Sequence, residues 1–340
     1  MTKEQGEGET ISAIELMRPK DSSAEASRLR KECGERFFRE HRNELVEVAC
    51  PACGMEGDFV LRKFGFSHKR CRNCKTMYCS PRPTEKLLAE YYETSEATRY
   101  WTRLLVETDV SRKALQYGPR VQKIIEIIRA SSTAAPNTMV DIGAGSGAFA
   151  VAMKRTNFCS KVIALDISKE CVDTCKRQNL DTMLGDISSL PKHSADLLTL
   201  NDLFEHLFAP RDFLKASYEV LKPGGFISIA TPNGNGFDFR IFNGDTVNVT
   251  PPEHLNYFNP DSIQSLMEST GFELISVQTP GILDVEIVRR EFERNSKVLQ
   301  KDQFVLSILR DGTKSLSDNF QKFLSENLLS SHMLVIGKKI

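Results

Sequence analysis

The chain has 340 residues, of which 40% are hydrophobic and 26% charged, enough for a full core and for two domains or one elaborated domain. Because 45 basic residues balance 45 acidic ones, no net charge attracts nucleic acid or an anionic membrane, although a local patch remains open. The longest apolar stretches, residues 226–230 and 333–336, are far too short to cross a bilayer.

Residues 1–45 are interpreted as a polar tail followed by a helix. The first ten residues, MTKEQGEGET, lack the apolar core of a signal peptide. Nine cysteines at uneven positions, without a secretion signal, favour reduced thiols. We therefore expect a cytoplasmic protein with no membrane partner.

Residues 46–80 are predicted to be a zinc ribbon. Cys50 and Cys53 form one C-x-x-C turn, and Cys71 and Cys74 form a second after a gap of 17 residues. Zn²⁺ accepts four thiolates tetrahedrally at about 2.3 Å and then has no position left for water. The predicted metal is therefore structural, with these four cysteines as ligands. The alternative is four unrelated buried thiols.

Basic residues surround the two cysteine pairs. From residue 58 to residue 75 they face only one acid, Asp58. Such a patch could touch RNA, or it could be the solvated face of a domain too small to hide its charges; the second is favoured. The basic residues are Arg62, Lys63, Lys69, Arg70, Arg72 and Lys75.

Residues 81–130 are predicted to be linker helices, and an alternation of strands and helices fills residues 131–340. This alternation predicts parallel strands in a doubly wound α/β sheet. The linker helices are expected at 85–92 and 120–130, and the alternation opens with a strand at 139–142, a helix to about 155, a strand at 161–166 and a helix from 168.

A glycine-rich loop, VDIGAGSGAF at 140–149, follows the first of these strands and fits a dinucleotide fingerprint. Asp166 ends the second strand, where its carboxylate can accept both hydroxyls of a ribose, so NAD remains open. Asp141, however, stands just before the glycines, where it would repel a pyrophosphate and favour a cationic amino-acid ligand. Asp186, after the third strand, suits an adenine amine.

With DLFEH at 202–206 and the LKPGG turn at 221–225, these motifs resemble the class I S-adenosylmethionine-dependent methyltransferases over about residues 115–340. The resemblance implies a seven-stranded Rossmann-like sheet whose last strand, 331–338, runs antiparallel. It also implies S-adenosylmethionine as cofactor. An NAD-binding Rossmann-like domain is the alternative.

The resemblance implies a role for each part of the loop region. The glycines would contact the methionine part, Asp166 the ribose, and Asp186 with Ile187 the adenine, while Asp141 would orient the amino group. The residues expected at the cofactor are Asp141, Gly143, Ala144, Gly145, Gly147, Asp166, Ile167, Asp186, Ile187 and Asn201.

A narrower resemblance covers the chain from Cys50 onward. The order of zinc ribbon, SPRP linker at 80–83, methyltransferase core and TPPEHLNYF at 250–258 is similar to bacterial methyltransferases of surface-polysaccharide and nucleotide-sugar pathways. The pair Glu253–His254 is also similar to the sugar C-methyltransferases, in which a Glu-His pair sits at the acceptor, although the gap between the cysteine pairs is shorter here. This implies a small acceptor, such as a nucleotide sugar or glycan, methylated on O or C.

A base is needed if the acceptor is a hydroxyl or an acidic carbon, and histidine titrates near neutrality. His254 follows the loop 233–252, which is expected to cover the pocket, and is predicted to be the base, oriented by Glu253 or Glu205. His206 follows the fourth strand and is expected to cap or pack beneath the site; it is the second candidate for the base.

Two further segments were open to more than one interpretation. An insert at 282–330, with helical spacing at 283–292 and 316–328, could close the acceptor pocket, form a homodimer face or simply pack. The aromatic pair Tyr100–Trp101 could form a lid or pack.

Two functions of other classes remain open from the sequence. One is an RNA methyltransferase that holds its substrate with the basic ribbon, and the other is a methyltransferase-like binding module without activity. Neutral net charge counts against nucleic acid as a partner. The complete glycine loop with its acids counts against the inactive module.

Overall fold

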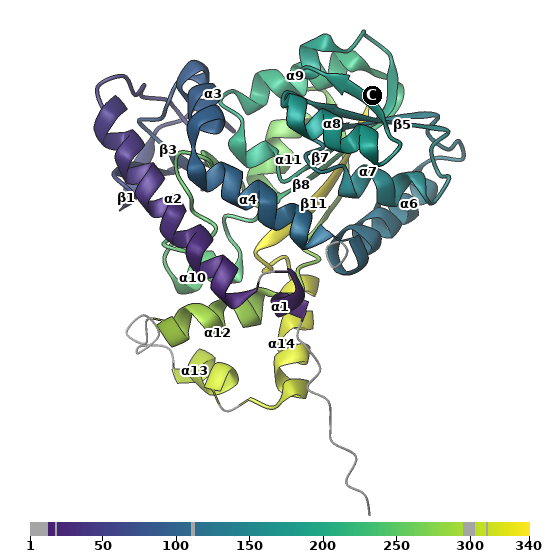
Figure 1. Ribbon diagram of the computed structural model, residues 1–340. Helices are drawn as coiled ribbons and strands as arrows, with labels where there is room; N and C mark the ends of the chain where they lie inside the picture. The colour runs from purple at the N-terminus through teal and green to yellow at the C-terminus, as the bar shows by residue number, and fades with distance from the viewer. Residues whose placement is uncertain (1–12, 18, 110–112, 295–302, 311) are drawn as a thin grey trace, which may run out of the picture.

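The computed structural model describes residues 13–17, 19–109, 113–294, 303–310 and 312–340. At its centre is a seven-stranded sheet with the strand order β10-β11-β8-β7-β4-β5-β6 (Figure 1). The strands are β4 (Thr138–Ile142), β5 (Lys161–Asp166), β6 (Asp181–Leu184), β7 (Ala195–Asn201), β8 (Leu221–Pro232), β10 (Phe272–Gln278) and β11 (His332–Lys339).

The strands from β8 to β6 are parallel, whereas β11 lies between β8 and β10 and runs antiparallel to both. The predicted α/β class, the seven-stranded Rossmann-like sheet and its antiparallel last strand are therefore confirmed. The order reverses between β4 and β7, so the loops after these strands diverge and leave room for a ligand at their carboxyl ends.

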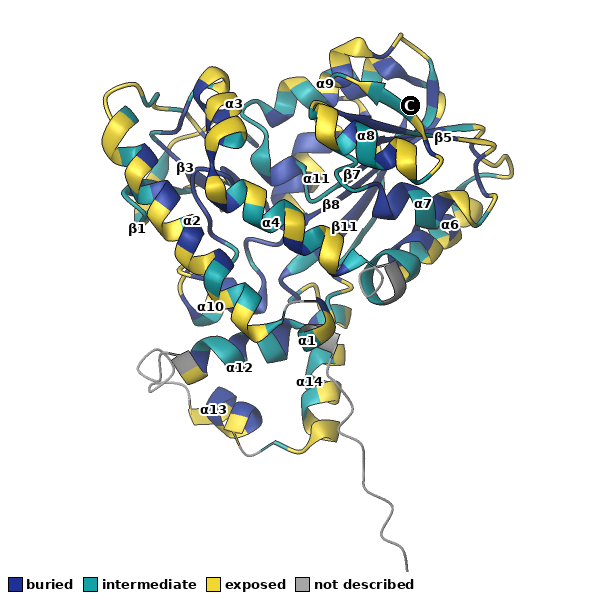
Figure 2. Ribbon diagram, in the orientation of Figure 1, coloured by how far each residue is buried: buried dark blue, intermediate teal, exposed yellow. Residues whose placement is uncertain are grey.

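Helices cover both faces of the sheet because the strands are apolar on both sides (Figure 2). Along β4, Val140 and Ile142 belong to one core cluster, while Met139 belongs to the cluster on the opposite face. Helices α9 (Pro210–Val220) and α11 (Pro260–Glu268) pack on the first face; α6 (Gly118–Ser131), α7 (Ala148–Lys154) and α8 (Lys169–Arg177) pack on the second.

The segment 46–80, predicted to be a zinc ribbon, forms most of a second sheet of four strands. Its order is β1-β2-β3-β9, all antiparallel. The first three strands come from the ribbon, but β9 comes from the segment directly after His254 and pairs Tyr257 with Met77. The segment 250–258, predicted from the sequence to lie at the acceptor and called the acceptor segment below, is thus joined to the ribbon by a strand. The bounds are β1 (Gly57–Lys63), β2 (Phe66–Cys71), β3 (Met77–Cys79) and β9 (Asn256–Tyr257).

Two long N-terminal helices, α2 (Lys20–His41) and α4 (Glu96–Glu107), pack against each other and run past the central sheet (Figure 1). The remaining N-terminal elements are short: α1 (Ala13–Met17), α3 (Glu85–Thr94) and the π-helix Lys113–Tyr117. The first ten residues, interpreted as a polar tail, lie outside the described residues.

The insert before β11 contains α12 (Asp284–Arg294), α13 (Gln303–Arg310) and α14 (Lys314–Glu326) and lies below the sheet in Figure 1. Helix α13 was not predicted. The insert packs with α10 (Phe237–Ile241) through a small core of its own, including Phe237, Val288 and Leu306. No helix within the described ranges is both long and apolar enough for a bilayer. Two short 3₁₀ segments, Ile187–Ser189 and Phe204–His206, follow β6 and β7.

Candidate active site

A cavity of about 1890 Å³ opens at the carboxyl ends of the parallel strands. It is lined by the glycine loop after β4, the ends of β5 and β7, the helices α2 and α4, and the segment before β9. All four residues predicted for catalysis reach it, as do nine of the ten expected at the cofactor. The exception is Gly147. A cavity of this size exceeds what one drug-sized ligand fills, so it has room for a cofactor and an acceptor together.

Backbone conformation explains why glycines occur in the loop after β4. Gly143 and Gly145 have φ angles of 69° and 54°, which favour glycine. A Cβ at Gly145 would meet no atom within 4 Å, so the backbone there is open to the cavity, whereas a Cβ at Gly147 would lie 2.8 Å from Leu180. Gly147 therefore permits close helix packing at the start of α7 and does not line the cavity.

Asp166 organises the loop from the end of β5. Its Oδ2 accepts a hydrogen bond from the Gly145 N–H at 2.9 Å, and its Oδ1 accepts one from the Ser168 N–H at 2.8 Å. Burial raises the pKa of Asp166, and the two backbone donors oppose that rise. Since each oxygen has a second lone pair, the carboxylate can still accept hydrogen bonds from a diol.

Two more acids flank the glycine loop. Asp186 accepts from the Ser188 N–H at 2.9 Å and caps a 3₁₀ turn. Ile167, which is 69% exposed, lines the same cavity. Asp141 is only 2% exposed, and its Oδ1 accepts from Thr199 Oγ1 at 2.6 Å. Burial raises the pKa of Asp141 to about 7.

Asn201, at the end of β7, connects Asp141 to a cation that the sequence had not singled out. Its Nδ2 donates to Asp141 Oδ1 at 3.1 Å, and its Oδ1 accepts from Arg120 Nη1 at 2.8 Å. Arg120 lies on α6 and is buried. A single arginine in an amphipathic helix carries no sequence signal that separates it from a surface residue.

The two predicted histidines lie together. Their ring centroids are 4.6 Å apart and the rings are nearly perpendicular, at 87°. His206 Nδ1 lies 2.9 Å from the Glu253 carbonyl oxygen, and His254 Nδ1 lies 2.8 Å from the Asn248 carbonyl oxygen. Because a carbonyl oxygen only accepts, Nδ1 carries the hydrogen in both neutral rings. Each Nε2 therefore keeps a lone pair.

Burial disfavours the charged forms of the side chains in this cluster. It lowers the pKa of His206 to about 4 and holds the pKa of His254 well below its ordinary value. Burial also raises the pKa of Glu205 to about 8, although Thr231 donates to its Oε2 at 2.9 Å. Tyr92 of α3 also belongs to this cluster, because its hydroxyl lies 2.8 Å from His206 Nδ1.

An arginine from α2 reaches the acceptor segment. Arg30 Nε lies 3.3 Å from Glu253 Oε2, and its guanidinium stacks on Trp101 of α4, 4.3 Å from the ring centroid. Burial raises the pKa of Glu253, and Arg30 opposes that rise. Of the aromatic pair, Trp101 lines the cavity, while Tyr100 packs against the core formed with α2 and α3. The sequence did not indicate Arg30.

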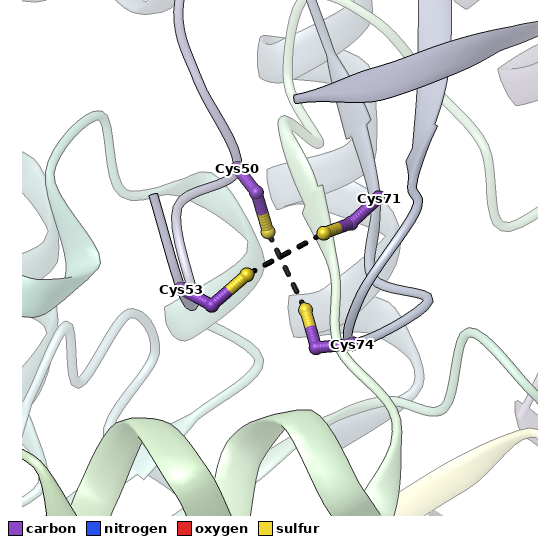
Figure 3. Close-up of side chains that lie close together, drawn as sticks. All are labelled: Cys50, Cys53, Cys71 and Cys74. Atoms are coloured by element: carbon purple, nitrogen blue, oxygen red, sulfur yellow. Dashed lines mark hydrogen bonds between the residues drawn. The ribbon is translucent and has the colours of Figure 1, made fainter. Parts of the chain in front are cut away.

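The four ribbon cysteines converge on one point (Figure 3). Their Sγ atoms are 3.5 Å apart for Cys50 and Cys74, and 3.4 Å for Cys53 and Cys71. Four sulfurs at 2.3 Å from a tetrahedral ion would be separated by about 3.8 Å, so the donor set fits Zn²⁺. Cys79 stays apart, with its thiol donating to the Pro81 carbonyl.

The strand order, the antiparallel β11 and the acids near the carboxyl ends of β4, β5 and β6 define the Rossmann-like methyltransferase fold. Residues 114–277 match the family model described as a methyltransferase domain. The chain therefore contains a methyltransferase domain.

Curated relatives are similar over part of their length. The ubiquinone biosynthesis O-methyltransferase of Coxiella burnetii is 25% identical over 153 residues, which cover 41% of this chain and 64% of the relative. The Vibrio cholerae enzyme of the same name is 25% identical over 150 residues, 40% of this chain and 60% of the relative. The chain thus spans less than two thirds of either relative. A SAM-dependent methyltransferase from Thermotoga maritima, described as a possible histamine N-methyltransferase, is 14% identical with a TM-score of 0.44, covering 71% of this chain and 98% of that one.

Proposed function

We propose that the protein is an S-adenosylmethionine-dependent methyltransferase whose acceptor is a small, sugar-containing molecule. The observation that carries the proposal is the single cavity that joins the glycine loop and Asp166 to the segment Glu253–His254. A methyl donor and an acceptor must share one space, because transfer is an in-line displacement that needs the reacting atoms in near-attack geometry. Incubation with labelled cofactor and fractionated cell extract, separating small molecules from RNA and protein, tests it.

The cofactor would lie along the carboxyl ends of β4, β5 and β6. In this proposal the open backbone at Gly145 faces the methionine part together with Gly143, Asp166 accepts from the ribose hydroxyls, and Asp186 with Ile187 faces the adenine. Asp141 attracts the ammonium group. If NAD bound and S-adenosylmethionine did not, the proposal would be wrong.

Asp166→Ala is expected to weaken S-adenosylmethionine binding by about tenfold or more, since hydrogen bonds to a charged acceptor are each worth about 1.5–3 kcal/mol. The change also removes the acceptor for the Gly145 N–H. Isothermal calorimetry measures the effect. Asp173→Ala, which changes a half-buried acid of α8 that does not line the cavity, is the matched control and should bind normally. Equal affinity of Asp166→Ala and wild type would contradict the assignment.

Cofactor affinity is also expected to depend on pH through Asp141. Its pKa of about 7 means that the carboxylate, which attracts an ammonium group, is lost as the pH falls. If only the ionised form binds, affinity at pH 6 should be roughly fivefold lower than at pH 7, a range in which the α-amino group of the cofactor stays protonated. Calorimetry at both pH values tests this. In Asp141→Asn the dependence should flatten; an unchanged profile would contradict it.

The acceptor would lie beyond the transferable methyl group, between the histidine cluster and α2–α4. Polar groups from Asn248, Glu253 and Arg30, beside the Trp101 ring, suit an acceptor with many hydroxyls. We propose that His254 Nε2, with its free lone pair, accepts the proton of the reacting group. Glu253 would be placed by Arg30, and His206 would support the loop through the Glu253 carbonyl.

The ribbon would hold a structural zinc ion on Cys50, Cys53, Cys71 and Cys74. Four thiolates leave no open coordination position, so the ion would stabilise the fold and not enter the chemistry. Asn259, at the start of α11, donates to the Cys74 carbonyl at 2.9 Å. The ribbon is therefore fixed to the methyltransferase core.

The alternative of an RNA methyltransferase rests on the basic residues of the ribbon. Three of them pair with acids: Lys63 with Asp245 at 3.0 Å, Lys69 with Glu47 at 2.7 Å and Arg72 with Asp58 at 2.6 Å. Two of these acids lie outside the segment counted in the sequence. This neutralisation favours a solvated face over a phosphate-binding one, and strongly salt-dependent binding to RNA would favour the alternative.

A further inference from the structure

Three side chains at the acceptor end of the cavity, Glu205, His206 and His254, offer ligand atoms that lie within 4.8 Å of one another. They come from two places in the chain: the turn after β7 and the segment before β9. The Leu255 N–H donates to the Glu205 carbonyl at 2.8 Å, which holds the two segments together. Their proximity is thus fixed by backbone pairing.

Hydrogen bonds to backbone carbonyl groups fix the orientation of both imidazole rings. Each Nδ1–H donates to a backbone carbonyl, of Glu253 and of Asn248, so the lone pair stays on Nε2. Among the described residues, no other side chain forms a hydrogen bond with either Nε2. Metal-binding histidines have this same arrangement, in which the second nitrogen donates to a carbonyl or carboxylate and sets the tautomer.

We propose that Glu205, His206 and His254 form a binding site for one divalent transition-metal ion. Two imidazoles and one carboxylate suit Zn²⁺, Co²⁺ and Fe²⁺ and leave coordination positions open. All three residues line the cavity, so the open positions face the space assigned to the acceptor. This ion would be separate from the one proposed for the cysteine ribbon.

The proposal deepens the proposed function and rests on it. An ion with adjacent open positions selects an acceptor with two neighbouring oxygen atoms, as in the vicinal hydroxyls of a sugar, and acts on the hydroxyl as a Lewis acid. A His254 Nε2 bound to a metal cannot also accept a proton. His254 therefore acts either as the base or as a metal ligand, and a measurement of metal binding distinguishes these two roles.

The test uses the full chain purified with its ribbon loaded with zinc, and Co²⁺ as the probe. We expect one further equivalent of Co²⁺ to bind per chain, with visible bands but without the intense sulfur charge-transfer absorption of a thiolate site. His254→Gln and Glu205→Gln should weaken Co²⁺ binding by about 100-fold or more. His193→Gln is the matched control, because His193 Nδ1 also lies near a backbone carbonyl, 3.1 Å from Leu221, outside the cavity.

Binding of S-adenosylmethionine separates the possible failures. A variant that keeps cofactor affinity is folded, and its Co²⁺ affinity can be compared. If a variant loses both cofactor binding and Co²⁺ binding, the wild-type protein provides the test. Bound Co²⁺ should broaden the NMR resonances of the His206 and His254 rings but not those of the His41 ring. The metal site is overturned if the wild type binds no additional Co²⁺, or if His254→Gln binds Co²⁺ as tightly as the wild type. Normal cofactor binding in the same experiment would leave the proposed function intact.

Discussion

His254→Asn is expected to lower turnover by roughly 10²–10⁴-fold, the usual contribution of a positioned acid or base, while cofactor affinity stays nearly unchanged. The shorter amide can still donate to the Asn248 carbonyl, which the imidazole Nδ1 approaches at 2.8 Å, so the loop keeps its anchor. What the change removes is the lone pair of Nε2. Single-turnover measurements with the true acceptor, together with calorimetry of the cofactor, separate chemistry from binding.

His193→Asn serves as the control for this experiment, since His193 lies outside the cavity and should leave turnover unchanged. His206→Asn is expected to act through stability, because the smaller amide loses the ring contacts that His206 makes with Tyr92 and His254. Its melting temperature should fall. Equal turnover in wild type and His254→Asn would refute the assignment and direct attention to His206 or to no protein group at all.

Loss of the ribbon metal is expected to have the second large effect. Cys71→Ser should release the zinc ion and unfold the ribbon, because structural zinc sites carry an apparent binding free energy of about 10–16 kcal/mol that is coupled to folding. Since β9 pairs with β3, the acceptor segment should become disordered as well. Elemental analysis measures the zinc content, and thermal unfolding followed by circular dichroism measures the stability.

Cys79→Ala is the matched control, because Cys79 is buried in the same sheet but lies outside the four-cysteine cluster. It should retain one zinc ion per chain. Absence of metal in wild-type protein purified without chelator, or full zinc content in Cys71→Ser, would contradict the structural zinc site.

Local sequence patterns were sufficient for much of the central sheet. Residues 139–142 and 161–166 were predicted as strands and correspond to β4 and β5, because apolar residues run through them between polar turns. The glycine loop and the acids Asp141, Asp166 and Asp186 could be located for the same reason: each lies near the carboxyl end of such a strand. The four cysteines needed only their spacing.

Features that depend on distant contacts could not be predicted. Strand β9 has only two residues, Asn256–Tyr257, and exists because β3 lies beside it. Arg30 is one of several charged residues on an amphipathic helix, and only the docking of α2 brings it to Glu253. The tautomers of the two histidines depend on carbonyl groups whose positions follow from loop geometry.

The pairing of β9 with β3 has a consequence for the order in which the protein is made. The partners Met77 and Tyr257 are separated by 180 residues (257 minus 77), so the ribbon strands leave the ribosome long before their fourth neighbour. Closing a loop of this length has an entropic cost and slows the formation of such contacts. His254 lies only three residues before Tyr257, so the nascent chain contains β4, β5 and β6 well before the segment that carries Glu253 and His254 can pair with β3.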